Sequence, residues 1–243
     1  MREMSAITLD QMSRIRLMNR VDTKFLTNKE ELLEILSYVQ KTYFVQEVKH
    51  KRIASYRTTY WDDNEHHFYL MHQNGHQPRM KIRVRTYEDS DDLTFLEIKS
   101  KDNKGKTHKV RTRVKSQNEL SQSGGNDFLA DNAGIELTKL HPCLQNHFKR
   151  ITLVNNGMTE RLTIDFDIEY NNFETNEMAD TGNLAVIELK CNGMFFSPIS
   201  DILTKLHIHS GGYSKYIFGS FMTNSNLKSN LIKPKFVEIK KLI

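Results

Sequence analysis

Several short segments of the chain alternate basic or acidic side chains with apolar ones. In one of them, Lys81, Arg83 and Arg85 are each separated by an apolar residue. Because successive side chains of a strand point to opposite faces, the three cations would share one face of a strand. The planar guanidinium suits two-pronged contact with phosphate, so two arginines on one face could hold successive phosphoryl groups.

Four further segments show the same alternation, and three of them add carboxylates to the charged face. The charged faces are Glu97 and Lys99; Lys109, Arg111, Arg113 and Lys115; Arg161, Asp165, Asp167 and Glu169; Glu188 and Lys190. They could form the solvated side of an ordinary sheet, or they could line the inside of a barrel. An unpaired buried ion costs several kcal/mol. Interleaved acids would offset part of that cost inside a barrel, and a polyanion with a metal ion would offset the rest.

The overall charge of the chain also favours an anionic partner. The 243 residues carry a formal net charge of +5 and have a sequence pI near 9.0. Such a balance suits nucleic acid, a membrane surface or a phosphorylated small molecule. Modules that bind single-stranded nucleic acid stack its bases on exposed aromatic rings, whereas the charged faces here alternate arginine with acid. We therefore expect no nucleic-acid partner.

The cysteines and the apolar stretches bear on the cellular compartment. Cys143 and Cys191 lie far apart and form no CxxC pair, which indicates reduced, buried thiols. No stretch approaches the roughly 18 apolar residues of a membrane span, and the start of the chain lacks an apolar signal region. We expect a cytoplasmic protein without a membrane span.

The hydrophobic periods predict many strands and few helices. We expect strands over 55–61, 67–72, 80–87, 93–100, 109–115, 150–155, 161–170 and 184–191. We expect helices over 28–41, within 127–149, from 198 to about 207, and from about 214 onwards. Without strand–helix–strand alternation, this order favours an antiparallel sheet or barrel. The interpretation is one domain over 1–225, followed by a basic, loosely ordered tail over 226–243.

Seven segments, in the same order along the chain, resemble those of the VTC-type polyphosphate polymerases, a branch of the triphosphate tunnel metalloenzymes. The segments are 20–25, 81–85, 97–99, 148–150, 161–165, 187–190 and 213–216. The resemblance implies an α+β fold in which an antiparallel β-barrel of about eight strands encloses a tunnel, with helices packed outside. It implies transfer of the γ-phosphate of ATP, or of another nucleoside triphosphate, onto polyphosphate. The same tunnel could instead hydrolyse triphosphate or short polyphosphate, or bind a polyanion without catalysis. The partners that the resemblance implies are the nucleotide and polyphosphate, triphosphate or pyrophosphate.

The resemblance also assigns roles to individual residues. The catalytic positions that it implies are Lys24, Arg83, Arg85, Lys99 and Arg150. The phosphate-binding positions that it implies are Arg20, Arg161, Lys190, Ser214 and Lys215. Glu188 matches the metal-binding glutamate, and a carboxylate with phosphate oxygens suits Mn²⁺ or Mg²⁺. Asp165, Asp167 and Glu97 are weaker candidates for that ion.

Two features limit the chemistry that the sequence predicts. The family often has a lysine two residues before the serine of its last motif, and this chain has Gly212 there. One phosphate contact is then missing, which weakens the case for chain elongation. The histidines His66, His67, His72 and His76 do not form the HExxH pattern of zinc enzymes, so we expect no zinc site among them.

Overall fold

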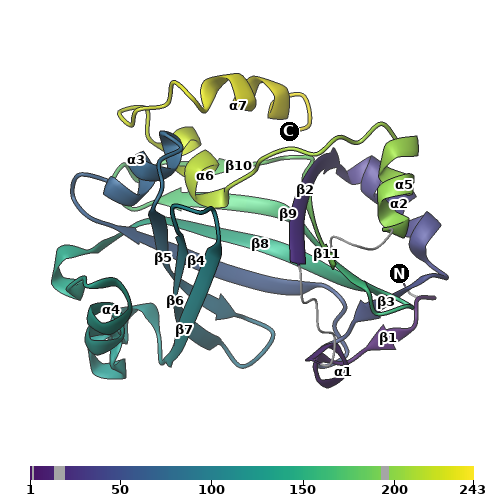
Figure 1. Ribbon diagram of the computed structural model, residues 1–243, viewed down its shortest axis with the longest axis horizontal. Helices are drawn as coiled ribbons and strands as arrows, with labels where there is room; N and C mark the ends of the chain where they lie inside the picture. Colours follow the sequence, from purple (N-terminus) through teal and green to yellow (C-terminus); the bar gives the residue numbers. More distant parts are fainter. Residues whose placement is uncertain (2, 14–19, 193–196) are drawn as a thin grey trace.

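The computed structural model describes residues 1, 3–13, 20–192 and 197–243, which form an α+β fold (Figure 1). The strands are β1 (Ala6–Ile7), β2 (Arg20–Asn28), β3 (Tyr43–Gln46), β4 (Ala54–Asp62), β5 (Arg79–Tyr87), β6 (Leu93–Lys101), β7 (Thr107–Val114), β8 (His141–Asn155), β9 (Glu160–Asn172), β10 (Met178–Asp180) and β11 (Leu184–Asn192). The helices are α1 (Leu9–Ser13), α2 (Lys29–Val39), α3 (His67–Gln73), α4 (Gly125–Ala133), α5 (Pro198–Lys205), α6 (Lys215–Thr223) and α7 (Lys233–Ile239).

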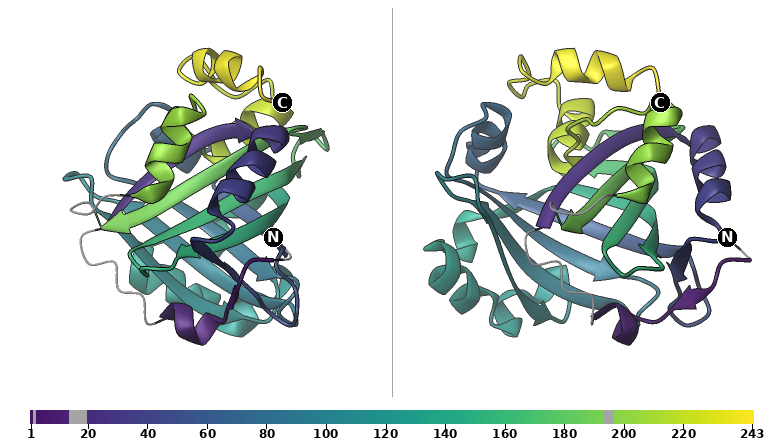
Figure 2. Two further views of the ribbon diagram at one scale, coloured as in Figure 1. Left: turned by 90° about the vertical axis from the view of Figure 1, so that its right-hand side faces the viewer. Right: turned by 45° about the vertical axis from the view of Figure 1, so that its right-hand side comes forward.

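All the strands belong to one large sheet, whose main path runs β2-β11-β9-β8-β4-β5-β6-β7. Every neighbouring pair on this path is antiparallel. The short strands β1, β3 and β10 pair at its margins, β1 with β3 in parallel. The sheet curves strongly (Figure 2), so that its two faces are a concave one and a convex one.

The prediction of a closed barrel is wrong. Within the described residues β2 and β7 stay at the two ends of the path and do not pair with each other. The β7 side chains are mostly exposed, and a loop covers the outer edge of β2. Phe25 forms an isolated bridge with Ser210, and the Gly211 N–H donates to the Lys24 carbonyl oxygen at 2.9 Å. Because a loop occupies the edge that a closing strand would need, the sheet remains open.

Helices cover the convex, apolar face, as the alternation of side chains predicted. Ile164 and Ile187 of the sheet pack against Ile35 of α2 and Ile199 of α5 in one buried cluster. The apolar face of β5 and β6 packs against Leu129 of α4 in another. Burying an apolar stripe of each helix on an apolar sheet face removes both from water. The charged side chains of these strands are thereby left for the concave face.

One helix, α6, packs on the concave face. Tyr216 of α6 stacks on Tyr60 of β4 with 4.8 Å between ring centroids, and both belong to a buried cluster with Phe148 of β8. Gly219 allows the close approach, because a Cβ there would lie 2.4 Å from a ring carbon of Tyr170. The start of α6 is therefore held against the strands that carry the charged side chains.

The tail is not loosely ordered, and that prediction is wrong. Residues 233–239 form α7, which lies over α6 (Figures 1 and 2). Ile232 and Ile239 are buried in the same cluster as α6. The Phe236 ring meets the Phe221 ring at 4.9 Å. A few apolar residues within a basic stretch are thus enough to dock the segment onto α6.

The strand expected over 67–72 is a helix, α3. Two aspartates that end β4 and follow it explain the difference. The Asp62 carboxylate accepts from the backbone N–H groups of Phe68 at 3.0 Å and Tyr69 at 2.8 Å, and Asp63 accepts from the first residue of α3 at 3.0 Å. Carboxylates that satisfy the unpaired N–H groups of a first turn favour a helix over a strand.

The helix expected within 127–149 is only partly present. Residues 125–133 form α4, but 141–155 form the long strand β8. Leu144, Asn146 and Phe148 are buried along it, and β8 pairs with β4 on one side and β9 on the other. Strand pairing on both sides therefore outweighed the helix that the sequence predicted for this segment.

Three of the predicted helix starts are confirmed. Asn28 caps α2 by accepting from the Glu31 N–H at 2.8 Å, and Ser214 caps α6 by accepting from the Ile217 N–H at 3.4 Å. Pro198 opens α5, where a missing N–H costs nothing. Within the described residues, none of the helices combines the length and apolarity that crossing a bilayer requires.

Candidate functional site

The charged side chains meet on the concave face because of the strand register. Lys81 of β5 lies opposite Lys99 of β6. Lys24 of β2 lies opposite Glu188 of β11, at the other end of the sheet path. Directly opposed residues of an antiparallel pair point to the same face. The curvature brings the two ends close enough for the charges of Lys24 and Lys81 to influence each other.

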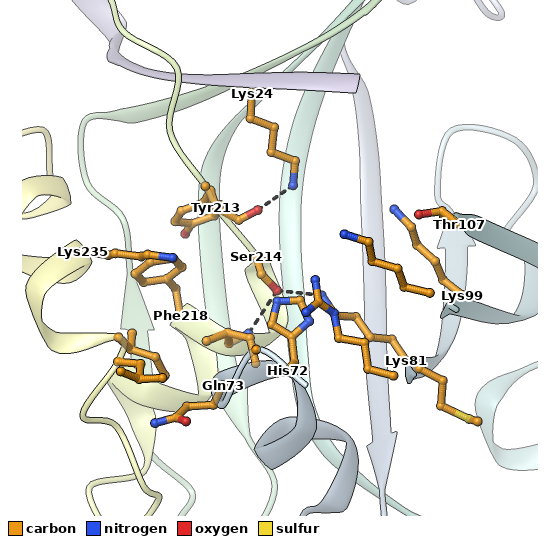
Figure 3. A pocket seen from close by; sticks show the side chains of 18 of the residues that line it. Lys24, His72, Gln73, Lys81, Lys99, Thr107, Tyr213, Ser214, Phe218 and Lys235 are labelled. Atoms are coloured by element: carbon orange, nitrogen blue, oxygen red, sulfur yellow. Dashed lines mark hydrogen bonds between the residues drawn. The ribbon is translucent and has the colours of Figure 1, made fainter. Parts of the chain in front are cut away.

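A cavity of about 710 Å³ lies on this face beside the start of α6 (Figure 3). Its volume is typical of sites for small molecules. The cations that line it are Lys24, Arg79, Lys81, Lys99, Lys101 and Lys235. Among the described residues that line it there is no aspartate or glutamate. The lining therefore suits an anion with several charges.

Two of these lysines have neutral hydrogen-bond partners. Lys24 Nζ donates to the Tyr213 carbonyl oxygen at 2.5 Å, and Lys81 Nζ donates to Ser214 Oγ at 2.9 Å (Figure 3). Both acceptors lie in the segment that leads into α6. The contacts hold the ammonium groups at the cavity without cancelling their charge.

The lysine pKa values reflect burial first and neighbouring charges second. Burial lowers the pKa of Lys24, although Glu188 and Asp165 oppose that shift. Burial also lowers the pKa of Lys81 well below its ordinary value, and neighbouring cations add to the shift. Burial also lowers the pKa of Lys99 to about 8, although Glu188 opposes the shift. Burial and like charge both disfavour an ammonium ion. A bound anion would reverse these shifts and would be stabilised in return.

Deeper on the face, Glu97 holds two cations. Its side chain is fully enclosed and accepts from Arg83 Nε at 2.8 Å, and Lys109 Nζ lies 2.5 Å from its other oxygen. Burial would raise the pKa of the Glu97 carboxyl, but Arg83 and the neighbouring cations outweigh it and hold that pKa at about 2. Glu97 is therefore ionised and occupied as a counter-ion.

Asp165 is the centre of a second group of this kind. It accepts from Arg150 Nε at 2.6 Å and from the Arg150 Nη2 at 2.8 Å, and it also accepts from Lys215 Nζ. Lys215 Nζ lies 4.1 Å above the Phe148 ring, and Arg150 lies 5.1 Å above the Tyr56 ring. Burial would raise the pKa of Asp165, but the two cations hold it well below its ordinary value. The buried Asp165 carboxylate is therefore the counter-ion of both cations.

Glu188 is the best placed carboxylate for a metal ion. Its side chain is 21% exposed, and its only salt-bridge partner in the described part of the chain is Lys190, at 2.8 Å. Burial would raise the pKa of Glu188, but Lys190 and Lys24 hold it at about 2. Mg²⁺ and Mn²⁺ need only one or two carboxylates when phosphate oxygens and waters supply the rest. Glu188 fits that role, whereas Glu97 and Asp165 are each taken by two cations.

Of the other predicted phosphate contacts, Arg85 and Arg161 lie on the same face. Arg85 is 7% exposed and donates to Thr58 Oγ1 at 3.1 Å. No salt bridge between Arg85 and a carboxylate occurs among the residues that the structure describes. Arg161 of β9 lies opposite Lys190 of β11. Arg20 is the first residue of β2, and its side chain lies outside the described part of the chain.

The sequence did not assign a role to several residues that line the cavity. Lys81 shares the alternation of Arg83 and Arg85, so the strand pattern could have identified it. Lys235 and His72 could not be found in this way. The first lies in a tail expected to be loosely ordered, and the second lies on a helix that was expected to be a strand.

Comparison with solved structures supports the fold. A Bacillus halodurans protein, provisionally assigned as an adenylate cyclase, has a TM-score of 0.51 at 15% identity, covering 83% of this chain and 98% of that chain. A Hippeastrum protein, provisionally assigned as an adenylyl cyclase and described as having a dominant triphosphatase activity, has a TM-score of 0.49 at 15% identity, covering 88% and 99%. At such identities the first likeness shows a shared fold. No curated protein sequence matches the chain significantly.

Comparison with protein families is more informative. The profile of the VTC domain matches residues 19–223. The matched stretch runs from the start of β2 to the end of α6 and includes every strand of the charged face. The chain therefore belongs to the VTC domain family.

Proposed function

We propose that this protein transfers the γ-phosphate of ATP, or of another nucleoside triphosphate, to the end of a polyphosphate chain. The observation that carries the proposal is the cavity lined by six cations and, among its described residues, no carboxylate. A site of this composition binds a polyanion more strongly than any neutral or cationic substrate. Membership of the VTC family supports an enzyme that acts on polyphosphate or triphosphate.

In the proposed step, a terminal phosphate oxygen of the chain attacks the γ-phosphorus of the nucleotide. A new P–O bond forms, and the bond from the γ-phosphorus to the β–γ bridging oxygen breaks, with its electron pair leaving on ADP. Phosphoryl transfer of this kind depends on positioning and on neutralising charge. Mn²⁺ or Mg²⁺ beside Glu188 would neutralise part of the phosphate charge when bound.

The protein's own residues supply the rest of that neutralisation. Arg85 is buried outside the lining of the cavity, and within the described residues it has no salt bridge to a carboxylate, so its charge adds to the positive face. Lys24 and Lys99 extend the same positive face into the cavity. Ser214 Oγ accepts from Lys81 and keeps its own hydrogen to donate to a phosphate. Asp165 accepts hydrogen bonds from Arg150 and Lys215 and so fixes the positions of both cations.

Hydrolysis of triphosphate is the second candidate, and Gly212 favours it. Gly212 lines the cavity, and a Cβ built there would meet nothing within 4 Å. A lysine at this position would have added a contact to a long product. With fewer contacts the product leaves sooner, and water can then attack the γ-phosphorus in place of a chain end.

The test is to incubate the purified protein with ATP and Mn²⁺, and to separate the products on a gel that resolves phosphate chain length. A ladder of products longer than the substrate is expected. Release of inorganic phosphate alone would assign the protein to hydrolysis. Absence of both products, together with absence of tripolyphosphate binding, would overturn the proposal.

A matched pair of arginine variants shows whether the charged face is responsible. Arg85→Ala should lose both activity and tripolyphosphate binding. Arg57→Ala removes an arginine of β4 that is 46% exposed and lies 3.8 Å from Glu88, and it should keep both. Equal behaviour of the two variants would show that phosphate is bound elsewhere.

A further inference from the structure

Outside the charged face, metal-binding side chains meet near the start of α3. One ligand atom each of His66, Cys143 and Glu174 lies within 4.8 Å of the other two. The residues come from three places: the turn before α3, strand β8, and the turn after β9. A fourth side chain, His141, lies with Nε2 2.9 Å from Glu174 Oε1.

The distances suit a tetrahedral ion. His66 Nε2 lies 3.4 Å from Glu174 Oε2. Zinc binds histidine nitrogen and carboxylate oxygen at about 2.0–2.2 Å, so the edge of its coordination tetrahedron is about 3.4 Å. Cys143 Sγ lies within 4.8 Å of both atoms, and its contact to the His141 carbonyl oxygen, at 3.4 Å, is weak.

The donor types also separate this cluster from the charged face. Nitrogen, sulfur and oxygen donors together suit zinc and related transition metals, whereas oxygen donors alone suit magnesium. Glu188 offers only oxygen. The two places would therefore select different ions, and a chelator or metal that affects one need not affect the other.

We propose that His66, Cys143 and Glu174 bind a zinc ion, with His141 as a positioning residue that holds the Glu174 carboxylate. The fourth coordination position is left to a water molecule. Cys143 is 4% exposed, and burial raises the pKa of its thiol. The thiol proton must leave when zinc binds, so affinity rises with pH.

Such an ion would stabilise the segments that border the cavity. It would tie the start of α3 to β8 and to the turn after β9. Residues His72 and Gln73 of α3 line the cavity. Glu174 also accepts from Asn224, directly after α6, at 3.3 Å. Zinc would thus join two helices that border the cavity, without contacting the phosphates.

The test uses the full chain carrying Glu188→Gln, so that the carboxylate proposed for Mn²⁺ cannot contribute. Zinc is titrated against a chromophoric chelator, and Co²⁺ serves as a spectroscopic substitute. One ion per chain is expected, with a thiolate-to-cobalt charge-transfer band. His141→Gln should weaken zinc binding by about 10- to 100-fold, as is usual for residues that hold a ligand in place.

Two cysteine variants form the matched control. Cys143→Ser should abolish the charge-transfer band and the rise in Tm that zinc causes. Cys191→Ser removes the other free cysteine, which is half-buried in β11, and should change neither. If Cys143→Ser does not fold, Glu174→Gln must show the same loss of zinc stabilisation. A band that survives in Cys143→Ser, or less than one bound ion in the parent, would overturn the proposal.

Discussion

The cations that line the cavity and the cations deeper on the charged face have different hydrogen-bond partners. In the deeper part, Glu97 and Asp165 each hold two cations at hydrogen-bond distance. At the cavity, the acceptors of Lys24 and Lys81 within the described part of the chain are neutral oxygens. Both groups lie on one face of one sheet, and they differ in whether their cations are paired with carboxylates.

This difference assigns the two groups of cations to different tasks: the paired ones are compatible with a stable free protein, and those of the cavity favour ligand binding. A buried ion without a partner costs several kcal/mol, and pairing it removes most of that cost. The paired arginines can therefore be kept inside the protein in the absence of any ligand. Among the described residues, the lysines of the cavity have no carboxylate at salt-bridge distance. Burial is the main cause of their lowered pKa values, and a bound polyanion would offset that cost.

Glu188→Gln should have the largest effect on activity. We expect Mn²⁺-dependent turnover to fall to background while tripolyphosphate binding is partly kept, because the cations still hold the phosphates. Asp22→Asn is the control, since Asp22 is the other carboxylate bound by Lys190, at 3.1 Å. Turnover and calorimetric binding are the measurements. Wild-type turnover in Glu188→Gln would remove Glu188 from the metal site.

Asp165→Asn should have the largest effect on stability. It leaves Arg150 and Lys215 buried without their carboxylate, which costs about 3–5 kcal/mol. Asp167→Asn is the control, because Asp167 pairs with Lys29 and Lys149 at a site that is 31% exposed. Such exposed pairs contribute about 1 kcal/mol or less. Equal losses in urea unfolding would show that the paired group does not stabilise the free protein.

In contrast to Asp165→Asn, Lys81→Met should weaken ligand binding without destabilising the free protein. Removing one uncompensated cation should weaken tripolyphosphate binding by about 10- to 100-fold, since a hydrogen bond to a charged group contributes about 1.5–3 kcal/mol. The free protein should be at least as stable as wild type, because repulsion is relieved. Lys139→Met, at an exposed lysine outside the cavity lining, should change neither. A destabilised Lys81→Met would place Lys81 among the paired cations.

The pH dependence should differ between free and bound protein. Burial lowers the pKa of Lys99 from 10.5 to about 8, so between these values the unfolded chain binds more protons than the folded one. Stability of the free protein contributed by this group therefore rises with pH through that window. Tripolyphosphate affinity should fall over the same window, because the ammonium is lost. Unfolding and binding at pH 7 and 9 test this, and Lys99→Met should remove its share of both trends.

The alternation of residues allowed much of the fold to be predicted. Charged and apolar faces of β5, β6, β9 and β11 follow directly from residues two apart in the sequence. Closure of the barrel could not be predicted, because it depends on how Ser210 and Gly211 meet the edge of β2. The helix α3 was not predicted either, because its first turn depends on hydrogen bonds to the carboxylates that precede it.

In the candidate site, too, some features could be predicted from local sequence and others depend on the fold. Arg83, Glu97 and Asp165 could be placed on a charged face, but which of them are paired depends on register between distant strands. His66 and Cys143 are 77 positions apart by their numbers, so no spacing rule could bring them together. Local patterns predicted which face a side chain occupies, and only the fold determined its partners.

Gly212→Lys should have the smallest effect and gives the finest test of the cavity. The new side chain would start from a backbone with open space around it, since a Cβ there meets nothing within 4 Å. It would add a cation to a cavity that already repels cations, so the free protein should be slightly destabilised. A bound chain of phosphates should gain one charged contact, worth about 1–3 kcal/mol and hence about a 5- to 150-fold increase in retention.

The measurement is the length of the products that wild type and Gly212→Lys make from ATP. Longer chains from the variant would show that the cavity holds the product, and that its uncompensated cations set how long the product stays. Gly212→Ser is the control, because it fills the same space without a charge. Unchanged lengths in both variants would show that the product does not pass Gly212. Inorganic phosphate as the sole product of all three proteins would favour hydrolysis, because an added cation would then have no chain to retain.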